Sequence, residues 1–182
     1  MAATATTAVP TGTWNVDPSH SKVGFSVKHL GIATVRGDFK TFEGSLTVAQ
    51  DGTVTAAGTV DASSVDTSEA ARDEHLRSAD FFDVAQFANI TFTSTEIKPT
   101  DDDEFTITGD LTMHGVTKPV TLKAEVSSTE EDPWGNTRVG LEISGALSRG
   151  DYDMKFNQAL GSGNVLVSDK VKLALDISAV KA

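Results

Sequence analysis

The feature that most constrains the fold of this chain is an alternation of apolar and polar residues in which glycines take apolar positions. In the segment 105–113, apolar residues such as Phe105 and Leu111 alternate with threonine and aspartate, and Gly109 occupies one apolar position. This period of two is typical of a β-strand with one buried and one solvated face. Four other glycines occupy apolar positions of such alternating stretches in the same way: Gly37, Gly44, Gly58 and Gly145.

A glycine that faces a protein interior contributes no side chain to fill it. If the five glycines line one enclosure, that enclosure is partly empty, and an empty apolar space is a candidate ligand site. Alternatively, the glycines relieve bends where long strands curve around a closed sheet. The alternation alone leaves both interpretations open.

Eight segments show strand-like alternation, and one segment shows helical character. The helical segment, 66–78, begins with a cap-like Asp66 and has Glu69 three residues later, which predicts a short helix between the third and fourth strands. Asp51-Gly52 predicts a tight hairpin. The eight expected strands lie within residues 23–27, 34–48, 53–60, 90–97, 105–113, 120–126, 139–147 and 165–177.

The scarcity of helices limits the possible architectures. A sheet with one apolar face must bury that face, and this chain offers no helical layer to cover it. The sheet must therefore close on itself or pair with a second sheet. Because the longest segments would extend about 30 Å at ~3.4 Å per residue, we predict an all-β fold: an extended, eight-stranded antiparallel β-barrel of lipocalin-like type with one helix near one end.

Composition excludes several classes of function. The chain has 182 residues and a net charge of −11, which opposes a nucleic-acid backbone or an anionic membrane surface as the main partner. It has no cysteine, which excludes disulfides and thiolate chemistry. No stretch is long and apolar enough for stable membrane insertion. We expect residues 1–12 to form a flexible leader and residues 13–182 to form one domain. Because the leader shows no signal-peptide pattern, we expect a cytoplasmic protein.

Three motifs resemble those of a known family. They span residues 14–29 (WNVDPSHSKVGFSVKH), 72–83 (RDEHLRSADFFD) and 109–120 (GDLTMHGVTKPV). In type, order and separation they are similar to the YceI-like polyisoprenoid-binding family of bacteria, and the resemblance extends from Trp14 to Ile177. It implies an extended eight-stranded barrel whose lumen holds a long isoprenoid or similar amphiphile. It also implies proteins that are often exported and sometimes paired as homodimers.

The predicted ligand-binding residues are those expected to face the lumen. No cofactor is expected other than a bound isoprenoid or other lipid. The predicted set is Phe25, Val27, Phe39, Phe42, Phe92, Ile107, Gly109, Leu111, Met113, Leu122, Leu141, Ile143, Gly145 and Arg149.

Arg149 is the charged member of this set. It belongs to the set because it continues the inward register of residues 143–147. A guanidinium that points into a barrel must be paired. One interpretation pairs it with Asp151 or with an acidic residue of the helical segment. In the other interpretation, Arg149, with Arg72 or His75, contacts the polar head of a ligand whose tail fills the lumen. Guanidinium groups suit this role because they bind phosphate oxygens in a bidentate manner. Trp14 and Trp134 are either rim aromatics or core residues.

Metal binding and catalysis find little support. The four histidines, His20, His29, His75 and His114, lack the close spacing of metal ligands, so no metal site is predicted. Neither a nucleophile elbow nor a phosphate-binding glycine loop occurs, and the acidic residues 101–104 are typical of a solvated loop.

We therefore expect a protein that is not an enzyme and that binds, carries or sequesters a long-chain amphiphile, with isoprenoid quinones and prenyl lipids as the favoured class. Fatty acids or fatty amides are the near alternative. A small lyase or isomerase that uses Arg149, Asp151 or His20 on an enclosed apolar substrate is the alternative from another class.

Overall fold

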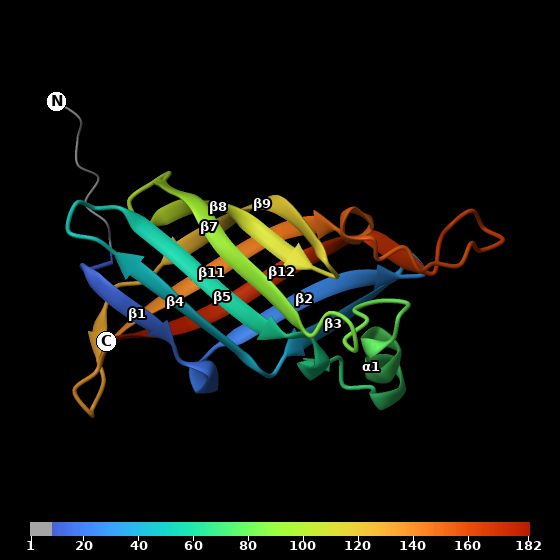
Figure 1. Ribbon diagram of the computed structural model, residues 1–182, viewed down its shortest axis with the longest axis horizontal. Coiled ribbons are helices and arrows are strands. Elements are labelled where there is room, and N and C mark those ends of the chain that lie inside the picture. Colours follow the sequence, from blue (N-terminus) through green and yellow to red (C-terminus); the bar gives the residue numbers. More distant parts are fainter. Residues whose placement is uncertain (1–8) are drawn as a thin grey trace.

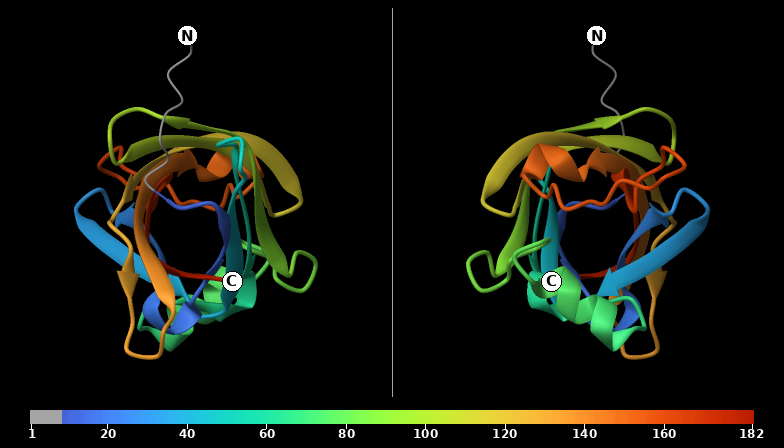
Figure 2. Two further views of the ribbon diagram at one scale, coloured as in Figure 1. Left: turned by 90° about the vertical axis from the view of Figure 1, so that its left-hand side faces the viewer. Right: turned by 90° about the vertical axis from the view of Figure 1, so that its right-hand side faces the viewer.

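The computed structural model describes residues 9–182 and shows a closed antiparallel barrel (Figures 1 and 2). From β4 to β11 the long strands pair in chain order, and the last strand, β12, closes the ring by pairing with β11 on one side and with β1 and β2 on the other. The strands of the ring are β1 (Gly12–Val16), β2 (Lys22–His29), β3 (Ala33–Phe39), β4 (Phe42–Val48), β5 (Val54–Asp61), β7 (Asn89–Pro99), β8 (Glu104–Met113), β9 (Val116–Val126), β11 (Thr137–Ser148) and β12 (Val167–Lys181).

Two of the eight staves of the barrel are interrupted strands. β1 and β2 follow each other along β12, separated by the short 3-10 turn η1 (Pro18–His20). β3 and β4 follow each other along the opposite side of that stave, because β3 pairs with β2 and β4 pairs with β1. Counted this way, the ring has eight antiparallel staves, which confirms the predicted fold class.

Tight turns connect the staves where the sequence contains turn residues. Asp51-Gly52 joins β4 to β5, as predicted, and Gly52 has a φ of 88°. His114 and Gly115 form the two-residue connection between β8 and β9, with φ values of 54° and 74°. Positive φ at both central residues suits the twist of a hairpin, and the glycine adopts it without steric cost.

The helical segment lies at the end of the barrel opposite the chain termini (Figure 1). It comprises η2 (Ala62–Ser64), the two-residue strand β6 (Val65–Asp66) and the helix α1 (Ala70–Arg77). The prediction that Asp66 caps the helix is wrong: Asp66 accepts from the Ser68 backbone N–H at 2.8 Å, and the side chain of Glu69 caps α1. The positive φ of 65° at Ser68 turns the chain between the strand and the helix, so the helix starts later than expected.

Ordered structure begins before Trp14. Val9 is 4% exposed and packs in the core, and the Trp14 indole N–H donates to the Pro10 carbonyl at 2.9 Å. Residues 9–12 of the expected leader are therefore part of the barrel, whereas residues 1–8 lie outside the described residues. The connection between β9 and β11 contains a further short strand, β10 (Glu130–Glu131), which pairs with the start of β11.

The buried apolar residues form two clusters, one towards each end of the barrel. The first, which we call the Trp14 cluster, includes Trp14, Phe105, Val139 and Ile177 and lies near the chain termini. The second, which we call the Phe82 cluster, includes Phe39, Phe82, Met113 and Tyr152 and lies beside α1. Together they bury the apolar faces of the staves at both ends.

Candidate ligand-binding cavity

A cavity of about 450 Å³ lies inside the barrel. Its lining includes residues of the Trp14 cluster at one end and of the Phe82 cluster at the other. Trp14 is fully buried and closes the first end. Exposed residues of α1, Arg72 and His75, line the other end, so the cavity reaches solvent beside the helix. We call this end the mouth.

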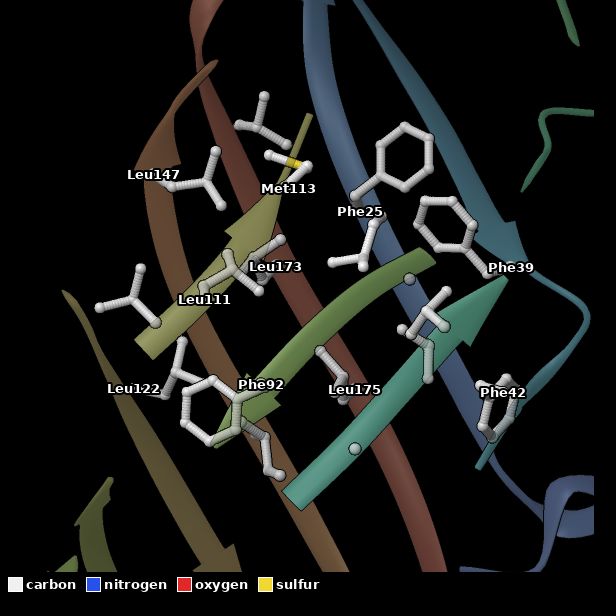
Figure 3. Close-up of a pocket in the computed structure, with 18 of the residues that line it drawn as sticks. Phe25, Phe39, Phe42, Phe92, Leu111, Met113, Leu122, Leu147, Leu173 and Leu175 are labelled. Atoms are coloured by element: carbon white, nitrogen blue, oxygen red, sulfur yellow. The ribbon is translucent and has the colours of Figure 1, made fainter. Parts of the chain in front are cut away.

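The wall of the cavity is largely apolar. Figure 3 shows aromatic rings from Phe25, Phe39, Phe42 and Phe92 and aliphatic side chains from several strands directed into one space. Because apolar walls of this size are typical of sites for apolar ligands, the cavity is a candidate binding site. Twelve of the fourteen predicted site residues line it: Phe25, Val27, Phe39, Phe42, Phe92, Ile107, Leu111, Met113, Leu122, Leu141, Ile143 and Arg149.

The other two predicted site residues, Gly109 and Gly145, do not line the cavity. A Cβ atom on Gly109 would lie 2.4 Å from Cζ of Phe92, and one on Gly145 would lie 2.5 Å from Cδ2 of Leu122. Large side chains of neighbouring strands thus cover these glycines. Gly37 is covered in the same way by its cross-strand partner Phe25.

Two glycines do contribute to the open space. Gly44 and Gly58 are cross-strand partners on β4 and β5, and both line the cavity. The nearest atom to a Cβ on Gly58 would be a backbone oxygen, that of Glu43, at 3.3 Å, and no side chain lies within 4 Å. The interpretation of the inward glycines as open space therefore applies to Gly44 and Gly58 and not to Gly37, Gly109 and Gly145.

Hydrogen bonds through Thr67 connect the buried Asp73 to Arg72 at the mouth. Asp73 is 7% exposed and accepts from both the backbone N–H and the hydroxyl of Thr67, at 2.8 and 2.5 Å. The guanidinium of Arg72 donates to the hydroxyl and the carbonyl of Thr67, at 2.7 and 2.8 Å. These bonds fix the orientation of the Arg72 side chain relative to α1.

His75 lies on the same helix and also lines the mouth. Its Nε2 is 2.8 Å from Oδ2 of Asp80. The imidazole packs edge-on against the rings of Phe81 and Phe156, with centroids 5.1 and 5.0 Å away. Aromatic rings and cationic side chains therefore share this end of the cavity.

Arg149 is buried at the mouth, with 5% of its surface exposed, in the 3-10 turn η3 (Arg149–Tyr152). Its guanidinium donates to three backbone carbonyls, those of Ser168, Met154 and Val167, at 2.9, 2.7 and 3.1 Å. Burial lowers the pKa of Arg149, and the negative charge of nearby Asp169 opposes this effect.

Within residues 9–182, Arg149 forms no ion pair with any of its predicted partners. Asp151 is exposed, and no carboxylate of the helical segment bonds to the guanidinium. Main-chain carbonyls provide the pairing instead, which sequence alone does not indicate. Asp151 and His20 also lie outside the cavity lining, so the residues suggested for a lyase or isomerase do not meet around one enclosed space.

In the described part of the chain, the four histidines have different hydrogen-bond partners or positions and do not form one cluster with acidic residues. His20 bonds to Asp17 at 2.8 Å, and His114 bonds to the Tyr152 carbonyl at 2.9 Å. His29 and His75 both line the cavity. Within residues 9–182, no group of three or more histidine or acidic side chains is arranged to hold a metal ion.

Asp17 and Asp132 both bond to the guanidinium of Arg138, at 2.8 Å each. The bonds from Arg138, Ser19 and His20 lower the pKa of Asp17. This ion-pair network ties η1 to the β10–β11 hairpin and lies away from the cavity lining.

Several lining residues were not predicted. Leu147, Leu173 and Leu175 lie on the inward registers of β11 and β12, so the same alternation identifies them. Phe81, Met154 and Phe156 lie outside the strands, where no periodicity marks the inward side. The strand part of the site is therefore readable from sequence, whereas the loop part depends on tertiary structure.

Fold and cavity together define a class: an extended, lipocalin-like eight-stranded barrel with an apolar lumen. The YceI-like domain family model matches residues 14–179. Protein YceI of Escherichia coli O157:H7 is 45% identical to this chain over 138 residues, which cover 75% of this chain and 72% of that protein. The chain therefore belongs to the YceI-like family.

Solved structures share the same fold. Burkholderia cenocepacia BcnA matches with a TM-score of 0.78 at 21% identity, covering 90% of this chain and 98% of that chain. A polyisoprenoid binding domain from Saccharophagus degradans, implicated in plant cell wall breakdown, matches with a TM-score of 0.69 at 17% identity, covering 93% of this chain and 98% of that chain. At these identities, the likeness concerns the fold.

Proposed function

We propose that this protein binds a long-chain amphiphile, with its apolar tail in the lumen, and carries or sequesters it. The observation that supports this most directly is the 450 Å³ cavity, which has an apolar wall, a closed end at Trp14 and a mouth beside α1. Burial of a tail there removes apolar surface from water, at about 0.8 kcal/mol per CH2-sized group before the costs of binding.

The favoured ligand class is the polyisoprenoids, including isoprenoid quinones and prenyl lipids. The YceI-like family membership supports this choice, as does the shared fold with the polyisoprenoid binding domain of Saccharophagus degradans. We infer a binding protein rather than an enzyme, because Asp151 and His20, two of the three residues suggested for the catalytic alternative, lie outside the cavity lining.

The polar head of the ligand is proposed to lie at the mouth, near Arg72, His75 and Arg149. Each terminal nitrogen of the Arg149 guanidinium carries two N–H groups. Each of these nitrogens donates one hydrogen bond to a backbone carbonyl. The remaining N–H groups suit a phosphate, carboxylate or carbonyl oxygen. This also supports the alternative of a fatty acid or fatty amide, whose head presents such oxygens.

Extraction of the purified protein tests the proposal. Protein prepared without detergent is expected to release a long-chain compound into organic solvent, detectable by mass spectrometry, in an amount approaching one molecule per chain. An isoprenoid in the extract would favour the first class, and a fatty acid or amide would favour the second. If the extract holds no lipid and the protein takes up neither added quinone nor added fatty amide, the proposal is wrong.

A further inference from the structure

Two loops at the mouth end of the barrel carry large apolar side chains in contact with solvent. Ile32, in the β2–β3 turn, is 79% exposed, and Val165, in the loop before β12, is 41% exposed. Figure 1 shows both loops at the end opposite the termini, with the longer loop projecting beyond the strands. The Leu30 backbone N–H donates to the Leu166 carbonyl at 3.0 Å, so the two loops are adjacent. We call Ile32 and Val165 the apolar tips.

The apolar tips are continuous with the cavity. His29, Leu166 and Val167 line the lumen, and each lies within three residues of a tip in the chain. An apolar ligand that leaves the lumen along these loops would thus pass residues that already contact the cavity. The transfer of exposed apolar side chains at such a position from water into an apolar phase is energetically favourable.

The charge of the two loops differs from that of the rest of the molecule. Segments 28–36 and 154–167 contain Lys28, Arg36 and Lys155 and no acidic residue, although the chain has 26 acidic residues. The loops at the other end contain Asp101–Glu104 and Glu130–Asp132. Because repulsion from phosphate groups is weakest where acidic residues are absent, these two loops are better suited to approach a phospholipid surface than the acidic loops at the other end or the helical segment, where Glu69, Glu74 and Asp80 are exposed.

We propose that the apolar tips dock the mouth of the barrel on a phospholipid bilayer, so that the ligand passes between the lipid and the lumen without crossing water. The proposal rests on the proposed function. Two aliphatic side chains give reversible, shallow contact rather than stable insertion. Within residues 9–182, no helix has the length and apolar character needed to span a bilayer.

Vesicle flotation tests the surface without any ligand. The full chain is expected to float with phosphatidylcholine vesicles, and the double variant Ile32→Ser/Val165→Ser is expected to bind at least about tenfold more weakly, because burial of one aliphatic side chain contributes roughly that factor. Trp134→Ser is the matched control, since Trp134 is 81% exposed on the β10–β11 hairpin at the opposite end. Equal loss in the control, or no flotation of the unmodified chain, overturns the proposal.

Ligand transfer gives the second measurement. With a fluorescent anthroyloxy fatty acid bound, the rate of transfer to quencher-containing vesicles is expected to rise with vesicle concentration for the unmodified chain. The double variant is expected to bind the probe equally well but to transfer it about tenfold more slowly. A rate independent of vesicle concentration shows release into water and overturns the docking proposal. Failure to bind the probe or any lipid, with flotation intact, overturns the proposed function alone.

Discussion

Arg149 has a structural role, and the proposed function gives it a binding role in the same place. Three of its five N–H donors bond to backbone carbonyls on both sides of the loop 154–167, which ties this loop to the end of β11. The other two N–H donors form no bond to these carbonyls, and Arg149 lines the cavity. The effect of a substitution at this position must therefore be measured on both the stability of the protein and its ligand selectivity.

We expect Arg149→Met to weaken the binding of a prenyl pyrophosphate much more than that of the matching neutral alcohol, because only the charged head gains from the guanidinium. The variant should also lower the melting temperature, since each buried carbonyl left without a donor costs about 1 to 3 kcal/mol. Dissociation constants for both ligands and thermal unfolding measure the two effects separately.

Arg138→Met is the control for this measurement. It removes a guanidinium that bonds to Asp17 and Asp132 away from the cavity, so it should lower stability without changing the ratio of the two affinities. If Arg149→Met weakens both ligands equally while the melting temperature falls, Arg149 is purely structural and the head group lies elsewhere.

At the scale of single elements, the strands were largely predictable and their joints were not. Alternation identified every stave, because each buries one face and exposes the other. It did not reveal that β12 continues to Lys181 or that the first two staves are interrupted, since closure of the ring by long-range pairing determines these features. The loop residues Met154 and Phe156, which complete the mouth, have no periodic signal.

Inward glycines illustrate the same limit. All five lie on the apolar register, but whether such a position is empty depends on the side chain of the neighbouring strand. Phe92 covers Gly109, whereas Gly58 faces its cross-strand partner Gly44 and remains open. Sequence alone predicted the inward direction correctly and could not say which glycines border the cavity.

Gly58 and Gly109 therefore form a matched pair for substitution. Gly58→Leu should leave the barrel folded and place a side chain in the lumen, so ligand affinity falls. Gly109→Leu should lower stability by about 1 to 3 kcal/mol, because it adds atoms to filled space. Thermal unfolding and a ligand titration on each variant distinguish the two outcomes.

Alanine variants at the same positions control for the backbone. Neither glycine has a positive φ, so alanine introduces no conformational strain. Gly58→Ala should retain binding, whereas Gly109→Ala should already be destabilised, since its Cβ would lie 2.5 Å from the Thr93 carbonyl oxygen. Full affinity in Gly58→Leu would show that the ligand does not occupy this part of the barrel.

For the molecule as a whole, the two ends of the barrel have different characters. Trp14 and the Trp14 cluster close the end near the termini, where the acidic loops also lie. Cationic side chains and aromatic rings surround the other end, beside α1. Under the proposed function, this asymmetry implies that a tail enters in one direction only, with the head remaining at the mouth.

A lumen with one closed end predicts a limit to useful tail length. In the series geraniol, farnesol and geranylgeraniol, affinity should rise with each isoprene unit, at up to about 0.8 kcal/mol per buried CH2-sized group, until the tail reaches Trp14. The melting temperature should rise in parallel, because a ligand that binds only the folded state stabilises it by RT ln(1 + [L]/Kd). In Gly58→Leu, the gain should stop at a shorter chain, since the new side chain obstructs the lumen. Equal shifts for short and long alcohols would show that the tail does not lie inside the barrel.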